Sequence, residues 1–261
     1  MSSRISTCIL LLFFAATLLV VISCGNSTND GFPGGLSTTY EFLFSRNTED
    51  WFGDFADYET GRYMESYYEL TFLYAQLPQY LGRDLYGLYI SGNNHSADLF
   101  MFIKRRFDGF KPNTTYHMMF RVEFASDALE DSAGIGGGPG ASVYLKAGAT
   151  VVEPVPYIEG DFWRMNIDKG NQAAGGKDAL VLGNIGIPEH EASAPYRLKV
   201  LENSNPFEVT TDDMGVLWVI IGTDSGVEGV TSLYYSSIKI TFTEQKKITV
   251  PTASRTVLSG L

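Results

Sequence analysis

Cysteine and histidine are scarce in this chain of 261 residues, and their positions exclude several kinds of chemistry. Both cysteines, Cys8 and Cys24, lie in the first 24 residues. Residues 25–261 therefore hold no disulfide among themselves, no zinc site built on thiolates and no cysteine nucleophile. The histidines lie in separate segments, without the close spacing of a zinc site: His95, His117 and His190.

Positive charge is in short supply as well. The chain has 19 Lys and Arg residues against 30 Asp and Glu residues. Residues 1–23 contain one Arg and no acidic residue, so the remainder carries 18 basic against 30 acidic residues, a formal net charge of −12. A surface of this charge repels phosphate backbones and anionic lipid headgroups. We therefore exclude nucleic acid as a main partner.

Long apolar runs are almost absent, and the one that occurs lies near the start of the chain. Residues 9–22 form an almost unbroken apolar stretch after the single charge of Arg4. About 20 apolar residues are needed to span a bilayer, so this stretch is too short for a transmembrane helix. A basic start, an apolar centre and a small residue at the end are typical of a secretory signal peptide. We assign residues 1–23 to this leader.

The end of the leader, Val21-Ile22-Ser23-Cys24, resembles the lipobox of bacterial lipoprotein precursors, with an aliphatic residue three positions before the cysteine and a small residue just before it. The resemblance implies cleavage before Cys24 and lipidation of its thiol. Two acyl chains hold a protein stably on a membrane, whereas one does not. Gly25 stands where an Asp commonly retains such proteins at the inner membrane, which favours the outer membrane or cell surface of a bacterial envelope. The alternative is an ordinary signal peptide with a cysteine at the cut.

After the leader, the composition predicts a tether followed by one large β domain. Residues 24–35 are polar and rich in glycine, which suits a flexible spacer. Residues 36–243 are enough to bury a core of their own, and they carry no long amphipathic helical pattern. The periodicity weakens further on, so residues 244–261 are predicted to be an appendage.

Apolar residues at every second position are the main signal in the large domain. Three segments alternate apolar and polar side chains in this way: residues 115–124, 196–200 and 237–243. Two further runs, residues 99–103 and 216–222, are apolar on both faces, which predicts central strands. Turn-forming residues separate the segments at 109–114, 134–140, 202–206 and 212–215. The sequence therefore predicts an all-β fold, an antiparallel β-sandwich of two sheets.

Three segments resemble the jelly-roll fold of carbohydrate-binding modules. Residues 104–126 look like its turn and Tyr-containing strand, residues 206–241 like its closing strands, and residues 40–59 like its Phe-rich opening strand followed by a Trp. The resemblance implies a jelly-roll domain that binds glycan. It also implies a structural calcium site, but where that fold often carries an Asp this chain reads Tyr-Ser-Ser at 235–237. We predict no cofactor, with a structural calcium ion as the alternative.

Residues 161–183 are the most unusual stretch and the main candidate for a ligand site. Planar polar side chains occur there beside an aromatic ring, a combination that suits a sugar, whose C–H face stacks while its hydroxyl groups are hydrogen-bonded. The candidate residues are Trp163, Arg164, Asn166, Asp168, Asn171 and Gln172. The alternative is a strand end in which Trp163 belongs to the core and Asp168 forms a solvated pair with Lys169.

Residues 91–99 are a second candidate, because they gather polar side chains between two predicted strands. Asn and Asp side chains hydrogen-bond sugar hydroxyl groups, and a histidine can assist. The candidate residues are Asn93, Asn94, His95 and Asp98. The alternative is a polar turn whose side chains cap their own backbone. A third polar stretch, residues 223–229, is expected at the same end of the sandwich.

The sequence assigns no catalytic residue. It has no Gly-x-Ser-x-Gly motif, and the acid-x-acid pattern of jelly-roll glucanases is absent after Glu123. The leading hypothesis is a non-catalytic binding module, anchored to the membrane and binding a glycan such as a polysaccharide. One alternative is a polysaccharide-degrading enzyme on the same scaffold, whose paired carboxylates need leave no trace in sequence. Another is a structural envelope protein that binds a second protein.

Overall fold

The computed structural model describes residues 35–189 and 193–246. The leader, Cys24 and all but the last residue of the expected tether lie outside the described residues, as do His190 and most of the expected appendage. Their assignments therefore remain predictions.

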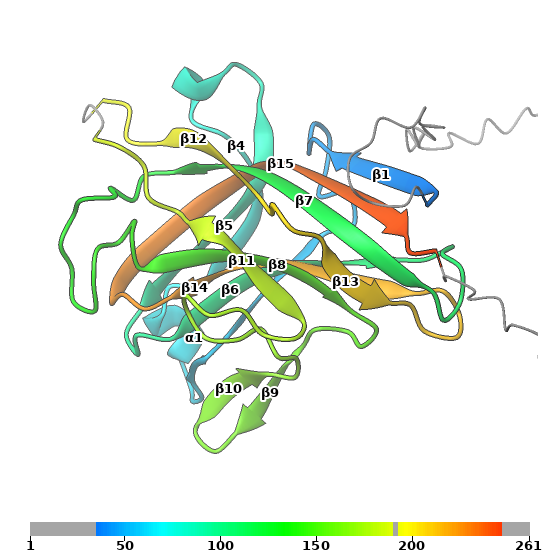
Figure 1. Ribbon diagram of the computed structural model, residues 1–261. Coiled ribbons are helices and arrows are strands. Elements are labelled where there is room, and N and C mark those ends of the chain that lie inside the picture. The colour runs from blue at the N-terminus through cyan, green and yellow to red at the C-terminus, as the bar shows by residue number, and fades with distance from the viewer. Residues whose placement is uncertain (1–34, 190–192, 247–261) are drawn as a thin grey trace, which may run out of the picture.

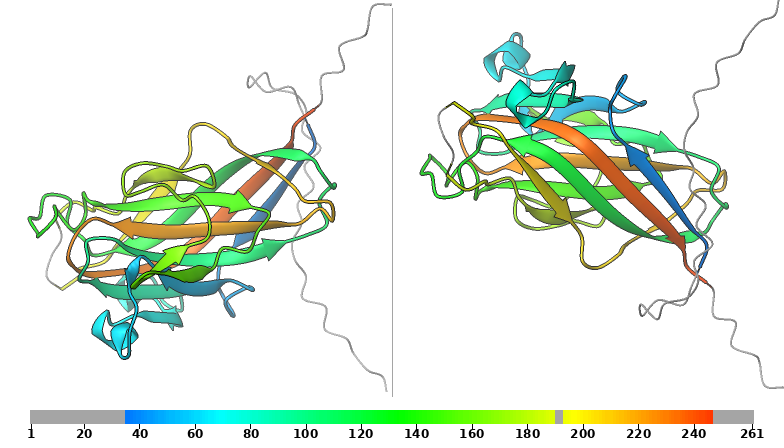
Figure 2. Two further views of the ribbon diagram at one scale, coloured as in Figure 1. Left: turned by 90° about the horizontal axis from the view of Figure 1, so that it is seen from below. Right: turned by 90° about the horizontal axis from the view of Figure 1, so that it is seen from above.

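The described chain is built around two antiparallel sheets packed face to face (Figures 1 and 2). Sheet A has seven strands in the order β12-β7-β15-β5-β4, with β1 paired to β15 and β13 paired to β7. Its strands are β1 (Ser37–Phe42), β4 (Thr71–Gln76), β5 (Tyr86–Asn94), β7 (Thr115–Ser126), β12 (Arg197–Glu202), β13 (Phe207–Thr210) and β15 (Gly229–Glu244).

Sheet B has five strands in the order β11-β8-β14-β6-β2. Its strands are β2 (Phe52–Ala56), β6 (Leu99–Phe107), β8 (Val143–Thr150), β11 (Ala179–Asn184) and β14 (Leu217–Ser225). The chain changes sheet at each step from β5 to β8 and again from β14 to β15, as in a jelly roll. The predicted antiparallel two-sheet β-sandwich is therefore confirmed.

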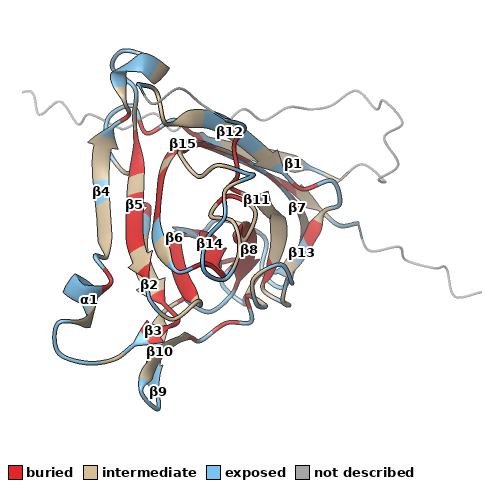
Figure 3. Ribbon diagram, turned by 90° about the vertical axis from the view of Figure 1, so that its left-hand side faces the viewer, coloured by how far each residue is buried: buried red, intermediate tan, exposed pale blue. Residues whose placement is uncertain are grey.

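The remaining elements are short and lie outside the two main sheets. They are the strands β3 (Tyr58–Glu59), β9 (Pro156–Glu159) and β10 (Phe162–Met165) of a small sheet C, the helix α1 (Met64–Tyr67) and the 3-10 helix η1 (Gln79–Leu81). Within the ranges that the structure describes, no helix has the length and apolar character of a membrane span. The β9–β10 hairpin and α1 project from the same side of the molecule (Figures 1 and 3).

The main core lies between sheets A and B and follows the period-two pattern of the sequence. In β7 the apolar side chains predicted to share one face are all buried: Tyr116, Met118, Phe120, Val122 and Phe124. They meet inward side chains of β6, β8 and β14 in one continuous cluster. The buried residues in Figure 3 accordingly concentrate on the strands of the two sheets.

Sheet B is also covered on its outer face, which explains why two of its strands are apolar on both sides. Leu99, Met101 and Ile103 of β6 point into the main core, whereas Phe100 and Phe102 point outward. The outward rings form a second, smaller cluster with Ala56, Met165, Ile167 and Ile220. We call residues 153–178 the covering segment, because its side chains close over this outer face. The predicted central strands at 99–103 and 216–222 are thus buried on both faces.

In β12 the alternating apolar side chains face outward, unlike those of the core strands. β12 is paired only to β7 among the described residues, and its Leu198 and Val200 remain 43% and 39% exposed. Lys199 points inward instead, and its Nζ donates to Asn184 Oδ1 at 3.0 Å and to the carbonyl oxygen of Gly186. The amine has partners there, so the strand can place its charged side inward.

Candidate functional site

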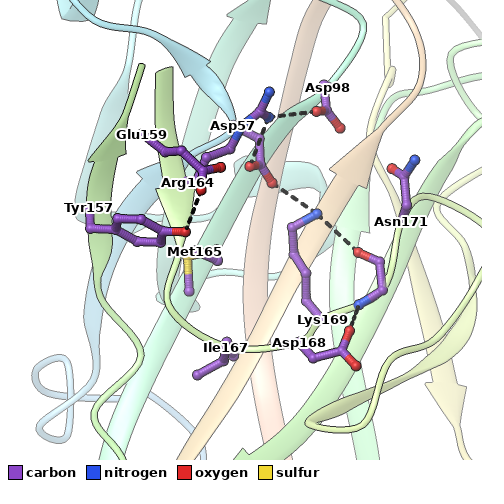
Figure 4. Close-up of a pocket in the computed structure, with 11 residues that line it drawn as sticks. Asp57, Asp98, Tyr157, Glu159, Arg164, Met165, Ile167, Asp168, Lys169 and Asn171 are labelled. Atoms are coloured by element: carbon purple, nitrogen blue, oxygen red, sulfur yellow. Dashed lines mark hydrogen bonds and ion pairs between the residues drawn. The ribbon is translucent and has the colours of Figure 1, made fainter. Parts of the chain in front are cut away.

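A cavity of about 320 Å³ opens between sheet C and the loop that follows β10 (Figure 4). We call it the Arg164 pocket. It is lined by Asp57, Asp98, Tyr157, Glu159, Arg164, Met165, Ile167, Asp168, Lys169, Gly170 and Asn171. A second hollow adjoins it and shares Tyr157, Met165, Ile167 and Asp168 with it, adding Asn166. Most of the lining is polar or charged, so the site suits a hydrophilic ligand.

A series of side chains with alternating positive and negative charge runs from the interior to the pocket. We call it the ion-pair chain. Its members are Lys146, Asp224, Lys169, Asp57, Arg164 and Asp98. The successive N–O distances along it are 2.8, 2.9, 2.9, 3.2 and 2.9 Å. Three cations and three anions neutralise one another, so the chain as a whole carries no net charge.

Exposure rises along the ion-pair chain from the interior to the pocket. The side chains of Lys146 and Asp224 are 1% and 0% exposed, whereas those of Arg164 and Asp98 are 31% and 33% exposed. Burial lowers the pKa of Lys146 further than its contact with Asp224 raises it. At Lys169 burial also lowers the pKa, but Asp224 and Asp57 outweigh it, and the net pKa lies above the ordinary 10.5. Lys169 is therefore held charged between two carboxylates.

Two strands and the turn between them place Asp57 at the centre of this arrangement. Asp57 lies between β2 and β3 in the left-handed backbone conformation (φ 58°), which Asp tolerates better than most residues. Its backbone N–H donates to the carbonyl oxygen of Trp163 at 2.7 Å, which ties it to β10. Its two carboxylate oxygens then accept from different cations, Oδ1 from Arg164 and Oδ2 from Lys169.

Arg164 is held at the inner wall of the pocket by three contacts. Its Nη1 donates to Asp57 Oδ1 and Asp98 Oδ2, and its guanidinium lies 4.6 Å from the centre of the Phe162 ring. Burial raises the pKa of Asp98, and the charge of Asp57 raises it further, although Lys169 and the bond from Arg164 act against them. The guanidinium is thus fixed in the lining of the cavity while it remains partly exposed.

The loop after β10 is shaped by its own carboxylates. Asp168 Oδ1 accepts from the N–H of Gly170, and Oδ2 accepts from the N–H of Lys177. Asp178 Oδ2 accepts in turn from the N–H of Asp168. Gly170 has a φ of 70°, and a Cβ on Gly176 would come within 2.3 Å of the carbonyl oxygen of Asp168. The Ala-Ala-Gly-Gly run at residues 173–176 therefore belongs to a tight loop.

The structure brings four of the predicted ligand residues together at the pocket: Arg164, Asp168, Asn171 and Asp98. Two more lie beside it. Asn166 holds the start of the covering segment, accepting from the N–H of Val155 and donating to the carbonyl oxygen of Glu153. Gln172 joins both candidate stretches, since its N–H donates to Asp224 Oδ2 and its Nε2 to the carbonyl oxygen of Ala97.

The other predicted ligand residues lie away from the lining. Trp163 is half-buried and packs against the main core. Asn94 is buried, and its Nδ2 donates to the carbonyl oxygens of Ser225 and Val227. Asn93 donates to Glu69 Oε1 at 3.0 Å. His95 is exposed and is stacked on a tyrosine ring of α1.

The proposed solvated pair of Asp168 and Lys169 is wrong. Lys169 is buried and pairs with Asp57 and Asp224, whereas Asp168 accepts from backbone N–H groups. Sequence reasoning also missed Asp57, Lys146, Tyr157 and Glu159. Lys146 carried a usable signal, since a lone lysine within the apolar run of β8 has to find an anionic partner when buried.

One oxygen at the inner end stays without a partner. Asp224 Oδ2 accepts three hydrogen bonds, whereas the buried Asp224 Oδ1 accepts none. Among residues 35–189 and 193–246, no group of three or more His, Cys, Asp or Glu side chains is placed to hold a metal ion.

No protein-family model and no curated protein matches the sequence. Solved structures with similar chains include an enzymatically active domain of tailspike protein 4 from bacteriophage CBA120, at 11% identity and a TM-score of 0.31, covering 76% of this chain and 20% of that one. The present chain thus spans about a fifth of the length of that domain's chain.

Two further similar structures are described as sugar-binding. A proposed sugar-binding protein from Bacteroides thetaiotaomicron VPI-5482 is 10% identical with a TM-score of 0.32, covering 78% of this chain and 91% of that one. The carbohydrate-binding module TmCBM27, which recognises mannan, is 9% identical with a TM-score of 0.31, covering 79% and 96%. TM-scores this low do not bear on the ligand of the present chain, which has to be inferred from its own site.

Proposed function

We propose that this chain is a glycan-binding module that works outside the cytosol on a lipid anchor, and that the saccharide binds in the Arg164 pocket. The observation that carries the proposal is the open polar cavity whose wall is fixed in place by the ion-pair chain. The anchor rests on the resemblance of residues 21–24 to a lipobox.

The pocket combines the groups that saccharide recognition requires. Carboxylates at Asp98, Glu159 and Asp168 accept hydrogen bonds, while Arg164 and the amide of Asn171 donate them. Tyr157 adds an aromatic ring that is 42% exposed. Most of the polar groups are held by the protein before the ligand arrives, so little ordering entropy is lost on binding. A polyol with hydroxyl groups on several sides can use such a set.

Binding to a glycan array, followed by calorimetry on the full-length protein in detergent, tests the proposal. Asn171→Ala should lower saccharide affinity by about fivefold to tenfold, because it removes one hydrogen-bonding side chain worth about 1 kcal/mol. Asn205→Ala is the matched control, since Asn205 is an exposed amide at the corner between β12 and β13. No saccharide binding at all, or equal effects of the two variants, would refute the pocket.

One observation favours a polysaccharide-degrading enzyme as a second candidate. Asp98 and Glu159 line the same cavity, and burial raises the pKa of Asp98; two carboxyl groups in one site are what glycoside hydrolysis uses as acid and base. Incubation with a panel of polysaccharides would then release new reducing ends, and Asp98→Asn would abolish them. Saccharide binding without any release of reducing ends would decide for the binding module.

A further inference from the structure

A second exposed feature lies at the start of the loop that carries Asp98. Tyr67, in α1, and His95, just after β5, are stacked with their ring centres 4.1 Å apart and their planes at 23°. Tyr67 is 54% exposed, and His95 is exposed as well. We call these two rings the Tyr67–His95 pair. It lies on the side of the molecule from which the β9–β10 hairpin also projects (Figures 1 and 3).

The Tyr67–His95 pair is held rigidly from behind. His95 Nε2 is hydrogen-bonded to the carbonyl oxygen of Tyr67 at 3.1 Å. The ring of Tyr68, only 1% exposed, makes edge contacts with both members, at 5.6 Å from Tyr67 and 5.3 Å from His95. The preceding residue, Asn94, is anchored to β14 and the turn after it. Since each stacked ring covers one face of the other, the surface left for a ligand is the outer face of the Tyr67 ring, which is held without further loss of side-chain entropy.

The Tyr67–His95 pair and the Arg164 pocket lie close together, because short stretches of chain connect them. Asp98 follows His95 by three residues, which span at most about 10 Å even when extended. On the other side, Tyr58 directly follows the pocket residue Asp57, and its ring lies 5.4 Å from that of Tyr68. Both routes connect the pocket wall to the aromatic pair through ordered residues.

We propose that the Tyr67–His95 pair is a second subsite, on which a further sugar unit of the saccharide bound in the Arg164 pocket stacks. The inference rests on the proposed function and narrows it: the ligand is an oligosaccharide with neutral pyranose units beyond the one in the pocket. A flat, exposed aromatic surface matches the C–H face of a pyranose, whereas the charged lining of the pocket matches hydroxyl groups. The two surfaces therefore divide recognition between hydrogen bonding and stacking.

Calorimetry with a length series tests this subsite. The probes are cello-, manno- and xylo-oligosaccharides from one to six units, titrated into the full-length protein in detergent. We expect affinity to rise from the monosaccharide to the longer members of the series that binds. Tyr67→Ala should lower affinity for the hexasaccharide by about tenfold and leave that for the monosaccharide unchanged.

Three variants separate stacking from a structural effect. Tyr67→Phe keeps the ring and should bind the hexasaccharide like the unaltered protein. His95→Ala should give the same selective loss as Tyr67→Ala, which keeps the test available if one variant folds poorly. Tyr63→Ala is the control, because Tyr63 is 69% exposed in the same segment but lies under Arg62 rather than beside His95.

Two outcomes overturn the subsite, and they can be told apart. If monosaccharide and hexasaccharide bind equally, or Tyr67→Ala and His95→Ala bind the hexasaccharide like the unaltered protein, only the subsite is wrong. If no saccharide of any length binds, the proposed function fails and the subsite fails with it.

Discussion

Lys169 and Asp57 form an ion pair of 2.9 Å although each side chain is only 7% exposed. Lys169 belongs to the covering segment, whereas Asp57 follows the edge strand β2 of sheet B. Taking two charges out of water costs several kcal/mol for each ion, and the cost is offset only where further partners are present. Both residues have such partners, Asp224 for Lys169 and Arg164 for Asp57. The covering segment is thus attached by charge as well as by its small apolar cluster.

Removing the central carboxylate should be costly. Asp57→Ala takes one partner from the buried Lys169 and one from the partly exposed Arg164. Breaking a buried pair such as Lys169–Asp57 destabilises proteins by about 3–5 kcal/mol. We expect a fall of that order in the free energy of unfolding, measured with urea. Asp108→Ala, which breaks the exposed pair with Arg106, should cost about 1 kcal/mol or less. Equal costs for both variants would contradict the structural role of the ion-pair chain.

The sandwich could be predicted from the sequence because its main strands obey period two. In β7 the inward set is the apolar set, and in β6 both faces are apolar because both are covered. The orientation of β12, in contrast, could not be predicted from period two. Its alternation is regular, but nothing in the sequence says that Lys199 finds partners inward while Leu198 stays exposed.

The ion-pair chain could not be predicted, because its pairs depend on strand register. Gly222 lies opposite Lys146, so Asp224 is the diagonal neighbour of Lys146 across two adjacent strands. A shift of register by one residue would turn one of the two side chains to the other face. The local stretch 161–183 did indicate a polar site, and three of its predicted residues line the pocket, together with Asp98 from the second stretch. Their partner Asp57 comes from a distant strand end that carries no such signal.

Trp163 and Tyr157 should separate folding from binding. Trp163 packs against the main core, so Trp163→Ala should lower the free energy of unfolding by about 2 kcal/mol or more. Tyr157 is 42% exposed at the pocket, so Tyr157→Ala should change stability by about 0.5 kcal/mol or less while weakening saccharide binding. Denaturation and calorimetry on both variants check this. Unchanged stability of Trp163→Ala would contradict the core role of Trp163 and favour its assignment as a ligand residue.

The Asp168 loop should be sensitive to acid. Hydrogen bonds from the N–H groups of Lys177 and Gly170 lower the pKa of Asp168 below its ordinary 3.8. A carboxylate whose pKa is lowered on folding stabilises the folded state above its unfolded pKa, and this contribution is lost as the pH falls through the folded pKa. The loop should therefore loosen below about pH 4. Amide hydrogen exchange of residues 168–178 against pH measures it.

Asp168→Asn is the matched variant for this experiment. Its amide can still accept one hydrogen bond, but it has no carboxylate to titrate, so its loop should exchange faster at neutral pH and show no further change attributable to residue 168 on acidification. Asp213→Asn, in the exposed turn before β14, serves as the control. An acid response that is the same in the unaltered protein and in Asp168→Asn would assign the sensitivity to another group.

The lipid anchor predicts a sharp difference between the two cysteines. Cys24→Ala removes the thiol to which the lipid would be attached, so the protein should no longer carry acyl chains and should leave the detergent-extracted membrane fraction or keep its leader uncleaved. Cys8→Ala changes a residue of the leader itself and should be lipidated and retained normally. Membrane fractionation and intact-mass spectrometry read both effects. A mature N-terminus at residue 24 without added mass, or equal retention of Cys24→Ala with its leader removed, would show that another contact holds the protein at the membrane.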